Sequence, residues 1–177
     1  MRTLFVLVAL FAAVAQDPIP PAPPVDIAGW QAATWGMTAA QVRAAFPEAV
    51  PLNPPVEDVG AFWRLEWRQA RLGTYPATAH FEFPPDRDSL CAVEVTIDPS
   101  YGCASVFDTL RTALVEKYGR PATETTTSGR NTFDSTSTKK QVQWLLKSPT
   151  IALTWYNTGN VGGVWVRYGQ RRPDPTL

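Results

Sequence analysis

Residues 91–121 read CAVEVTIDPSYGCASVFDTLRTALVEKYGRP, and this stretch decides the fold of the 177-residue chain. Apolar residues occupy every second position in residues 91–97, which predicts a strand with one buried face. After a Pro-Ser-Tyr-Gly turn the apolar residues recur every three or four positions, which predicts a helix with one apolar stripe. We expect Ser105 to cap this helix, and Gly119 followed by Pro121 to end it.

The same two periods predict the other elements. Thr38 and Gln41 form a T-x-x-Q capping box, which predicts a short helix ending at Pro47. A helix this short is marginal alone, so it must lie against a sheet. Alternation predicts strands in residues 61–68, 77–83, 141–147, 151–155 and 164–168. The Thr- and Ser-rich residues 122–140 predict a polar hairpin, with disorder as the alternative.

These elements together predict an α+β fold in residues 30–170. We expect an antiparallel sheet with two helices packed on one face, in the order helix, three strands, helix, then three to five strands. The two halves share this plan without sharing a residue-level repeat. One sheet face is apolar and can hold helices, while the other is charged, as antiparallel sheets permit.

The first residues predict export. Residues 1–15, MRTLFVLVALFAAVA, are apolar after Arg2 and end in the small-residue pattern that signal peptidase cleaves. The apolar run is shorter than the ~20 residues that span a bilayer, so an uncleaved anchor is the alternative. Residues 16–29 form a Pro-rich linker, and residues 171–177 are expected to be a loose tail. The expected location is the periplasm or the medium.

The chain has two cysteines, Cys91 and Cys103, at either end of the predicted strand-to-helix turn. In an oxidising compartment, so close a pair favours a disulfide bond. A metal or redox pair is the alternative, but the two cysteines lack CxxC spacing and any His or Cys neighbours. We therefore predict no metal site and no cofactor.

The charge balance argues against nucleic acid as a partner. The formal net charge is zero, with 16 basic and 16 acidic residues, and no basic stripe occurs. The sequence also lacks a G-x-S-x-G nucleophile motif and a phosphate-binding Gly-rich loop before either predicted helix.

Two short motifs resemble exported α/β domains. Gly36-Met37-Thr38 followed by Val42 resembles the opening of SmpA/OmlA-type outer-membrane assembly lipoproteins and of β-lactamase-inhibitor-protein-like domains, and Tyr118-Gly119-Arg120-Pro121 resembles their helix exit. The resemblance implies tandem helix-plus-sheet halves and an exported protein-binding or envelope-support role. The chain departs from the pattern at Phe46-Pro47 and lacks a lipidation cysteine near the cleavage point.

The charged face of the predicted sheet is the candidate binding surface. By alternation it carries Arg64, Glu66, Arg68, His80, Glu82 and Glu94. The only histidine, His80, allows an alternative interpretation as a general base oriented by Glu82 or Glu94. The simpler interpretation is a cross-strand ladder of charges.

The seven tryptophans divide into two groups. The alternation places Trp63, Trp67, Trp144 and Trp155 in the core. Trp165 is out of phase with its apolar neighbours, and Trp30 and Trp35 adjoin the linker. These three are candidate aromatic anchors, because buried aromatic residues dominate interfaces.

The sequence thus favours a non-enzymatic exported module that binds a protein or envelope component through the polar sheet face. An envelope hydrolase that uses His80 is one alternative, and a carrier of a small ligand between sheet and helices is another.

Intact-mass spectrometry of the exported chain under non-reducing conditions tests the export and disulfide predictions together. We expect a chain that begins at Gln16, with a mass lower by two hydrogens than that of its reduced form. A full-length chain would contradict the predicted cleavage, and a mass unchanged by reduction would contradict the disulfide.

Overall fold

The computed structural model describes residues 27–52, 63–84, 88–98, 104–130, 136–158 and 162–170. These residues form an α+β fold with two helices and antiparallel strands, as predicted for the fold class. The elements in chain order are β1 Gly29–Trp30, β2 Ala33–Thr34, α1 Ala39–Ala45, β3 Val50–Pro51, β4 Trp63–Leu72, β5 Tyr75–Phe83, β6 Ala92–Ile97, α2 Ala104–Tyr118, β7 Thr123–Arg130, β8 Thr136–Leu145, β9 Pro149–Asn157 and β10 Gly162–Gln170.

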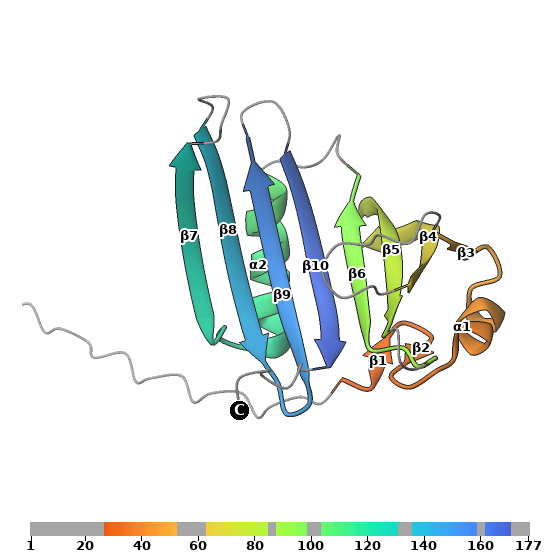
Figure 1. Cartoon of the computed structure of the whole chain (residues 1–177). Helices are drawn as coiled ribbons and strands as arrows, with labels where there is room; N and C mark the ends of the chain where they lie inside the picture. The colour runs from red at the N-terminus through yellow and green to blue at the C-terminus, as the bar shows by residue number, and fades with distance from the viewer. Residues whose placement is uncertain are drawn as a thin grey trace, which may run out of the picture.

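Within the described ranges, eight strands form one sheet in the order β3-β4-β5-β6-β10-β9-β8-β7 (Figure 1). All neighbouring strands are antiparallel. The sheet is thus built from two consecutive groups of strands, β3–β6 and β7–β10, which meet where β6 pairs with β10. β1 and β2 form a separate two-stranded sheet.

The strand registers assign every side chain to one of two faces. We call the apolar face the inner face; its central residues are Leu65, Ala79, Phe81, Val93, Val95, Val166, Leu153, Val142 and Trp144. All nine are at most 2% exposed, so the inner face is a continuous core surface from β4 to β8. We call the opposite face the outer face.

The first helix contacts the inner face near β4 and β5. The predicted capping box is confirmed, because Thr38 and Gln41 hydrogen-bond each other's backbone N–H. Phe46, which ends α1, lies 4.9 Å from the ring centroids of both Phe81 and Trp67. Trp30 lies 6.2 Å from the Phe81 ring centroid and completes this aromatic cluster.

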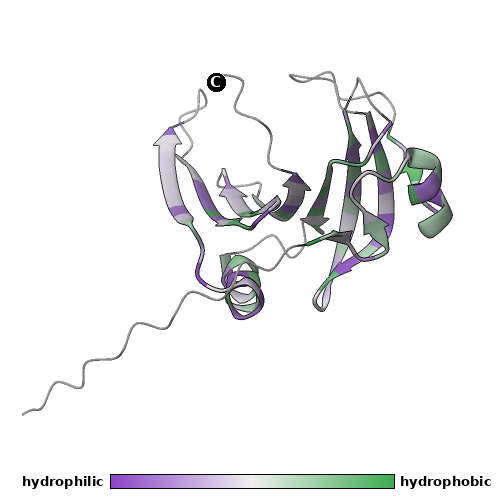
Figure 2. Ribbon diagram, turned by 90° about the horizontal axis from the view of Figure 1, so that it is seen from below, coloured by the Kyte–Doolittle hydropathy of each residue, from purple (hydrophilic) through white to green (hydrophobic). Residues whose placement is uncertain are grey.

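The second helix lies against the C-terminal strands (Figures 1 and 2). It buries Val106, Phe107, Leu110 and Leu114, the stripe that the sequence predicts. Gly119 follows it with φ at +78°, a conformation that favours glycine and ends the helix. The Trp144 indole of β8 donates a 2.9 Å hydrogen bond to the Gly119 carbonyl oxygen.

Local details differ from the predictions in two places. Ser105 does not cap α2, because the helix already begins at Ala104. Trp63 has no described side chain, and Trp67 is only partly buried, whereas Trp144 and Trp155 are in the core as predicted. The described residues of the Thr- and Ser-rich segment lie mostly in the paired strands β7 and β8, and residues 131–135 between them lie outside the described ranges.

The disulfide prediction finds no support in the described residues. The Cys91 sulfur donates a hydrogen bond to the Glu82 carbonyl oxygen at 3.3 Å, and Cys103 lies outside the described ranges. Residues 1–26 and 171–177 also lie outside them, so the leader, most of the linker and the tail stay predictions. Neither described helix is long and apolar enough to cross a bilayer.

Candidate functional site

A buried carboxylate lies at the centre of the predicted polar face. Glu82 of β5 is 1% exposed. Its Oε1 accepts a hydrogen bond from Arg64 Nη2 of β4, and its Oε2 accepts one from Arg167 Nη2 of β10, each at 2.6 Å. Both carboxylate oxygens therefore take part in charge-assisted hydrogen bonds, which are stronger than neutral ones.

Small residues on the neighbouring strands explain how a glutamate becomes buried on the face that the sequence predicts to be solvated. Across the sheet, Glu82 is followed by Ala92 on β6 and then by Gly169 on β10. A Cβ on Gly169 would lie only 3.0 Å from the Ala92 Cβ and 3.1 Å from Arg167 Nη1. The glycine thus leaves room for Arg167 to reach over β6. The expectation of a solvated, charged face is wrong at Glu82, because two arginine side chains cover it.

A second group of charges lies beside this network. Glu66 of β4 is 9% exposed, accepts a hydrogen bond from Arg68, and has its Oε2 3.4 Å from His80 Nε2. Burial raises the pKa of Glu66, but the hydrogen bonds from Arg68 and His80 outweigh it and hold the pKa below its ordinary value. The carboxylate that contacts His80 is therefore Glu66, and neither Glu82 nor Glu94 as the sequence predicted.

This arrangement weakens the catalytic interpretation. A general base needs an imidazole nitrogen within hydrogen-bond reach of a substrate proton. The His80 Nε2 faces Glu66, while its Nδ1 is buried and has no hydrogen-bond partner in the described parts of the chain. Glu94 stands opposite both His80 and Arg167 in the strand registers. The candidate residues thus lie together on one face, where Arg64 pairs with Glu82, and Arg68 and His80 pair with Glu66.

Farther along the outer face lie two aromatic side chains, which we call the aromatic patch. Trp165 of β10 is partly exposed, and Tyr156 of β9 is 37% exposed. A Cβ on Gly163 would be 3.7 Å from the Trp165 ring, so the indole extends over Gly163. Gly163 pairs directly with Tyr156, which places the two aromatic side chains next to each other.

Polar residues continue the outer face beyond the aromatic patch. Trp165 of β10 pairs with Thr154 of β9, and Thr154 also pairs with Gln141 of β8. Gln141 pairs in turn with Thr125 of β7. Thr154 is 2% exposed, whereas Thr125 is exposed. An apolar centre with a polar rim is the usual composition of a protein-binding surface.

The other two predicted anchors do not reach this surface. Trp30 is 7% exposed and stacks on Phe46 with ring centroids 6.3 Å apart, so it is a core residue. Trp30 is buried because the short strands β1 and β2 place it against the inner face. No local sequence pattern predicts this placement. Trp35 is partly buried against the core and donates a 2.7 Å hydrogen bond to the Ile27 carbonyl oxygen.

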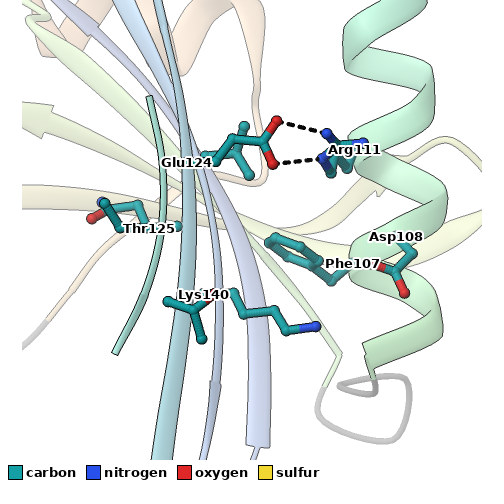
Figure 3. Close-up of a pocket in the computed structure, with 9 residues that line it drawn as sticks. Phe107, Asp108, Arg111, Glu124, Thr125 and Lys140 are labelled. Carbon is teal, nitrogen blue, oxygen red and sulfur yellow. Dashed lines mark hydrogen bonds and ion pairs between the residues drawn. The ribbon is translucent and has the colours of Figure 1, made fainter. Parts of the chain in front are cut away.

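A cleft of about 240 Å³ separates α2 from β7 and β8 (Figure 3). Arg111 and Glu124 face each other across it and form two hydrogen bonds of 2.6 and 3.2 Å, which raise the pKa of Arg111. Lys140 Nζ lies 5.9 Å from the Phe107 ring centroid and 5.4 Å from that of Trp155. The cleft contains two cations and two carboxylates, Asp108 being the fourth charge, so it shows no preference for one ligand charge.

The sequence reasoning missed Arg167 and Tyr156. Alternation within β10 puts Arg167 on the same face as Trp165, and this signal was present in the sequence. The pairing of β10 with β6, which brings Arg167 to Glu82, joins strands that are not consecutive and has no local signal.

Among the described residues, no three His, Cys, Asp or Glu side chains gather closely enough to hold a metal ion. Comparison of the chain with family models, curated proteins and solved structures found no match.

We expect the substitution Glu82→Gln to lower the free energy of unfolding by about 3 kcal/mol, because it leaves two arginines without their anion. This is the lower end for a buried ion pair, since the Arg64 and Arg167 side chains remain 26% and 31% exposed. Urea denaturation followed by circular dichroism measures the change.

The matched control is Glu94→Gln, the same substitution at a partly exposed position of the next strand. We expect it to change the free energy of unfolding by less than about 1 kcal/mol. Equal effects of the two substitutions would contradict the assigned importance of the Glu82 network.

Proposed function

We propose that this protein is an exported, non-enzymatic module that binds a protein or other envelope component through the outer face of its sheet. The observation that carries the proposal is the aromatic patch. Trp165 and Tyr156 lie on neighbouring strands of the outer face, and both side chains are partly exposed. Aromatic residues surrounded by polar ones supply most of the binding energy at protein interfaces.

The charges on the same face support a binding role with a defined location. Glu82 and Glu66 are neutralised by arginines of the same chain, and their carboxylates are nearly inaccessible. Partner recognition is therefore centred on the aromatic patch, and the ion pairs of Glu82 with Arg64 and Arg167 join the strands beside it. This shifts the binding surface from the position that the sequence favoured.

The remaining sequence predictions fit this proposal. The apolar leader with its cleavage pattern and the Pro-rich linker would deliver and tether the domain outside the cytoplasm. We also propose that the domain consists of tandem helix-plus-sheet halves with both helices on one face, as the resemblance to SmpA/OmlA-type and inhibitor-protein-like domains implies. Such halves leave the whole outer face available to a partner.

The hydrolase alternative receives less support. It requires His80 to act with Glu82 or Glu94, whereas His80 contacts Glu66, and the Glu82 oxygens accept hydrogen bonds from two arginines. The ligand-carrier alternative requires an apolar cavity between sheet and helices. The cleft between α2 and the sheet is instead lined mainly by charged and polar residues, and Phe107 and Val142 are its apolar ones.

Site-specific photo-crosslinking in cells that produce the chain tests the proposal. A photoreactive amino acid at position 156 should yield a discrete adduct with an envelope component, whereas the same group at Thr109, an exposed residue of α2, should not. Absence of any adduct at position 156, or identical adducts at both positions, would contradict binding through the aromatic patch.

The substitution Trp165→Ala should reduce the yield of that adduct at least tenfold, because loss of an interface anchor costs about 2 kcal/mol or more. Val50→Ala is the matched control, since Val50 is 53% exposed but lies in the edge strand β3. It should leave the yield unchanged. Equal losses for both variants would argue against a specific anchor.

A further inference from the structure

The two edges of the eight-stranded sheet are protected very differently. At one edge, β3 covers only Leu65 and Glu66 of β4 and ends in Pro51, which has no N–H to donate. The next part of β4 has a bulge between Trp67 and Ala70. Short edge strands, prolines and bulges are the devices by which natural sheets prevent strand addition.

The other edge is β7, which is neither short nor interrupted by a proline or a bulge, although it carries the charged residues Glu124 and Arg130. Its eight residues, TETTTSGR, contain no proline and no lysine, and all eight are exposed. β7 pairs with β8 from Thr123 to Arg130 without a register shift, so the strand is regular over its whole length. It ends the sheet order, and no described element lies outside it in Figure 1. Such an edge favours the addition of another strand.

We propose that β7 pairs antiparallel with β7 of a second copy of this chain, which forms a two-fold symmetric dimer with a continuous sheet. This inference uses an edge distant from the aromatic patch and does not depend on the proposed function. A second copy is the favoured occupant because the sequence of β7 is complementary to itself, as its possible registers show.

Strand geometry restricts those registers. In an antiparallel pair, residues opposite each other are both hydrogen-bonded or both not hydrogen-bonded, and these states alternate along each strand. A strand that pairs with its own copy can therefore be centred on a residue, but not between two residues. The two-fold axis then runs perpendicular to the sheet, so each residue faces a partner on the same side.

One residue-centred register pairs the opposite charges of β7. Centring on Thr127 places Glu124, which also accepts two hydrogen bonds from Arg111 of its own chain, opposite Arg130 of the second copy, and symmetry repeats this pair. Opposite charges across a strand pair are stabilising, and like charges are not. The same register places Thr125 opposite Gly129, where a Cβ would have no neighbour within 4 Å and the threonine therefore has room. Centring on Thr126 would instead leave Glu124 opposite Ser128.

The dimer would present both aromatic patches on one side. Because the two-fold axis is perpendicular to the sheet, the outer faces of the two copies point the same way. An edge contact of seven residues is small, so we expect a weak dimer whose population depends on concentration.

Cysteine substitution tests both the interface and its register. Thr127→Cys should form a disulfide-linked dimer under mild oxidation, because residue 127 faces its own copy at the two-fold axis. Thr125→Cys is the matched control on the same face of β7; in this register its two copies lie about 13 Å apart along the strands, beyond disulfide reach. Both variants keep the native Cys91 and Cys103, so the unsubstituted chain gives the background.

Sedimentation equilibrium provides the second measurement. The unsubstituted chain should pass from monomer to dimer between low micromolar and submillimolar concentration. Thr127→Lys should weaken the dimer at least several-fold by placing two ammonium groups opposite each other, whereas Thr109→Lys on exposed α2 should not. Far-UV circular dichroism verifies that each variant is folded.

The outcomes are decisive. Selective cross-linking of Thr127→Cys together with a dimer sensitive to Thr127→Lys would support the proposal. A chain that stays monomeric throughout, or a dimer indifferent to Thr127→Lys, would overturn it. Cross-linking through Thr125→Cys instead would overturn the proposed register.

Discussion

The pairing of β6 with β10 is the constraint on which the rest of the structure depends. It joins strands separated by about seventy residues and converts two groups of strands into a single sheet. Across this pairing Val95 faces Val166 and Val93 faces Tyr168, all buried on the inner face. This pairing, which we call the seam, therefore joins two smaller cores into one. A larger folded unit buries a greater fraction of the surface that its unfolded chain exposes.

On the outer face the same seam is crossed by an ion pair. Arg167 of β10 reaches over β6 to Glu82 of β5, which Arg64 of β4 also holds. A buried ion pair of this kind contributes little to stability compared with a well-packed apolar pair, but its rupture is costly. We infer that it specifies register, because a slip by one residue would turn Arg167 toward the apolar inner face and leave Glu82 without it.

Local features of this fold could be predicted from the sequence, and long-range ones could not. The alternation in residues 77–83 and 91–97, the capping box at Thr38 and the glycine that ends α2 each depend on neighbours in the chain, and all are present in the structure. The burial of Glu82 depends instead on Gly169 and Arg167, which reach it only through the pairing of β6 with β10. Trp30 shows the same limit, because it is buried by contacts with Phe46 and Phe81, which are far from it in the sequence. The candidate site followed this division: Trp165 and Tyr156 are both out of phase with the apolar residues of their strands, but their position beside each other depends on the pairing of β9 with β10.

Native-state hydrogen exchange at the seam tests this account most directly. If β6 and β10 hold one cooperative core together, the amides of Val93, Val95, Val166 and Tyr168 should all exchange through the same global unfolding, with a single free energy and a common denaturant dependence. A lower-energy opening that exposes the β10 amides while those of β6 stay protected would contradict it, because the two groups of strands would then be separate units.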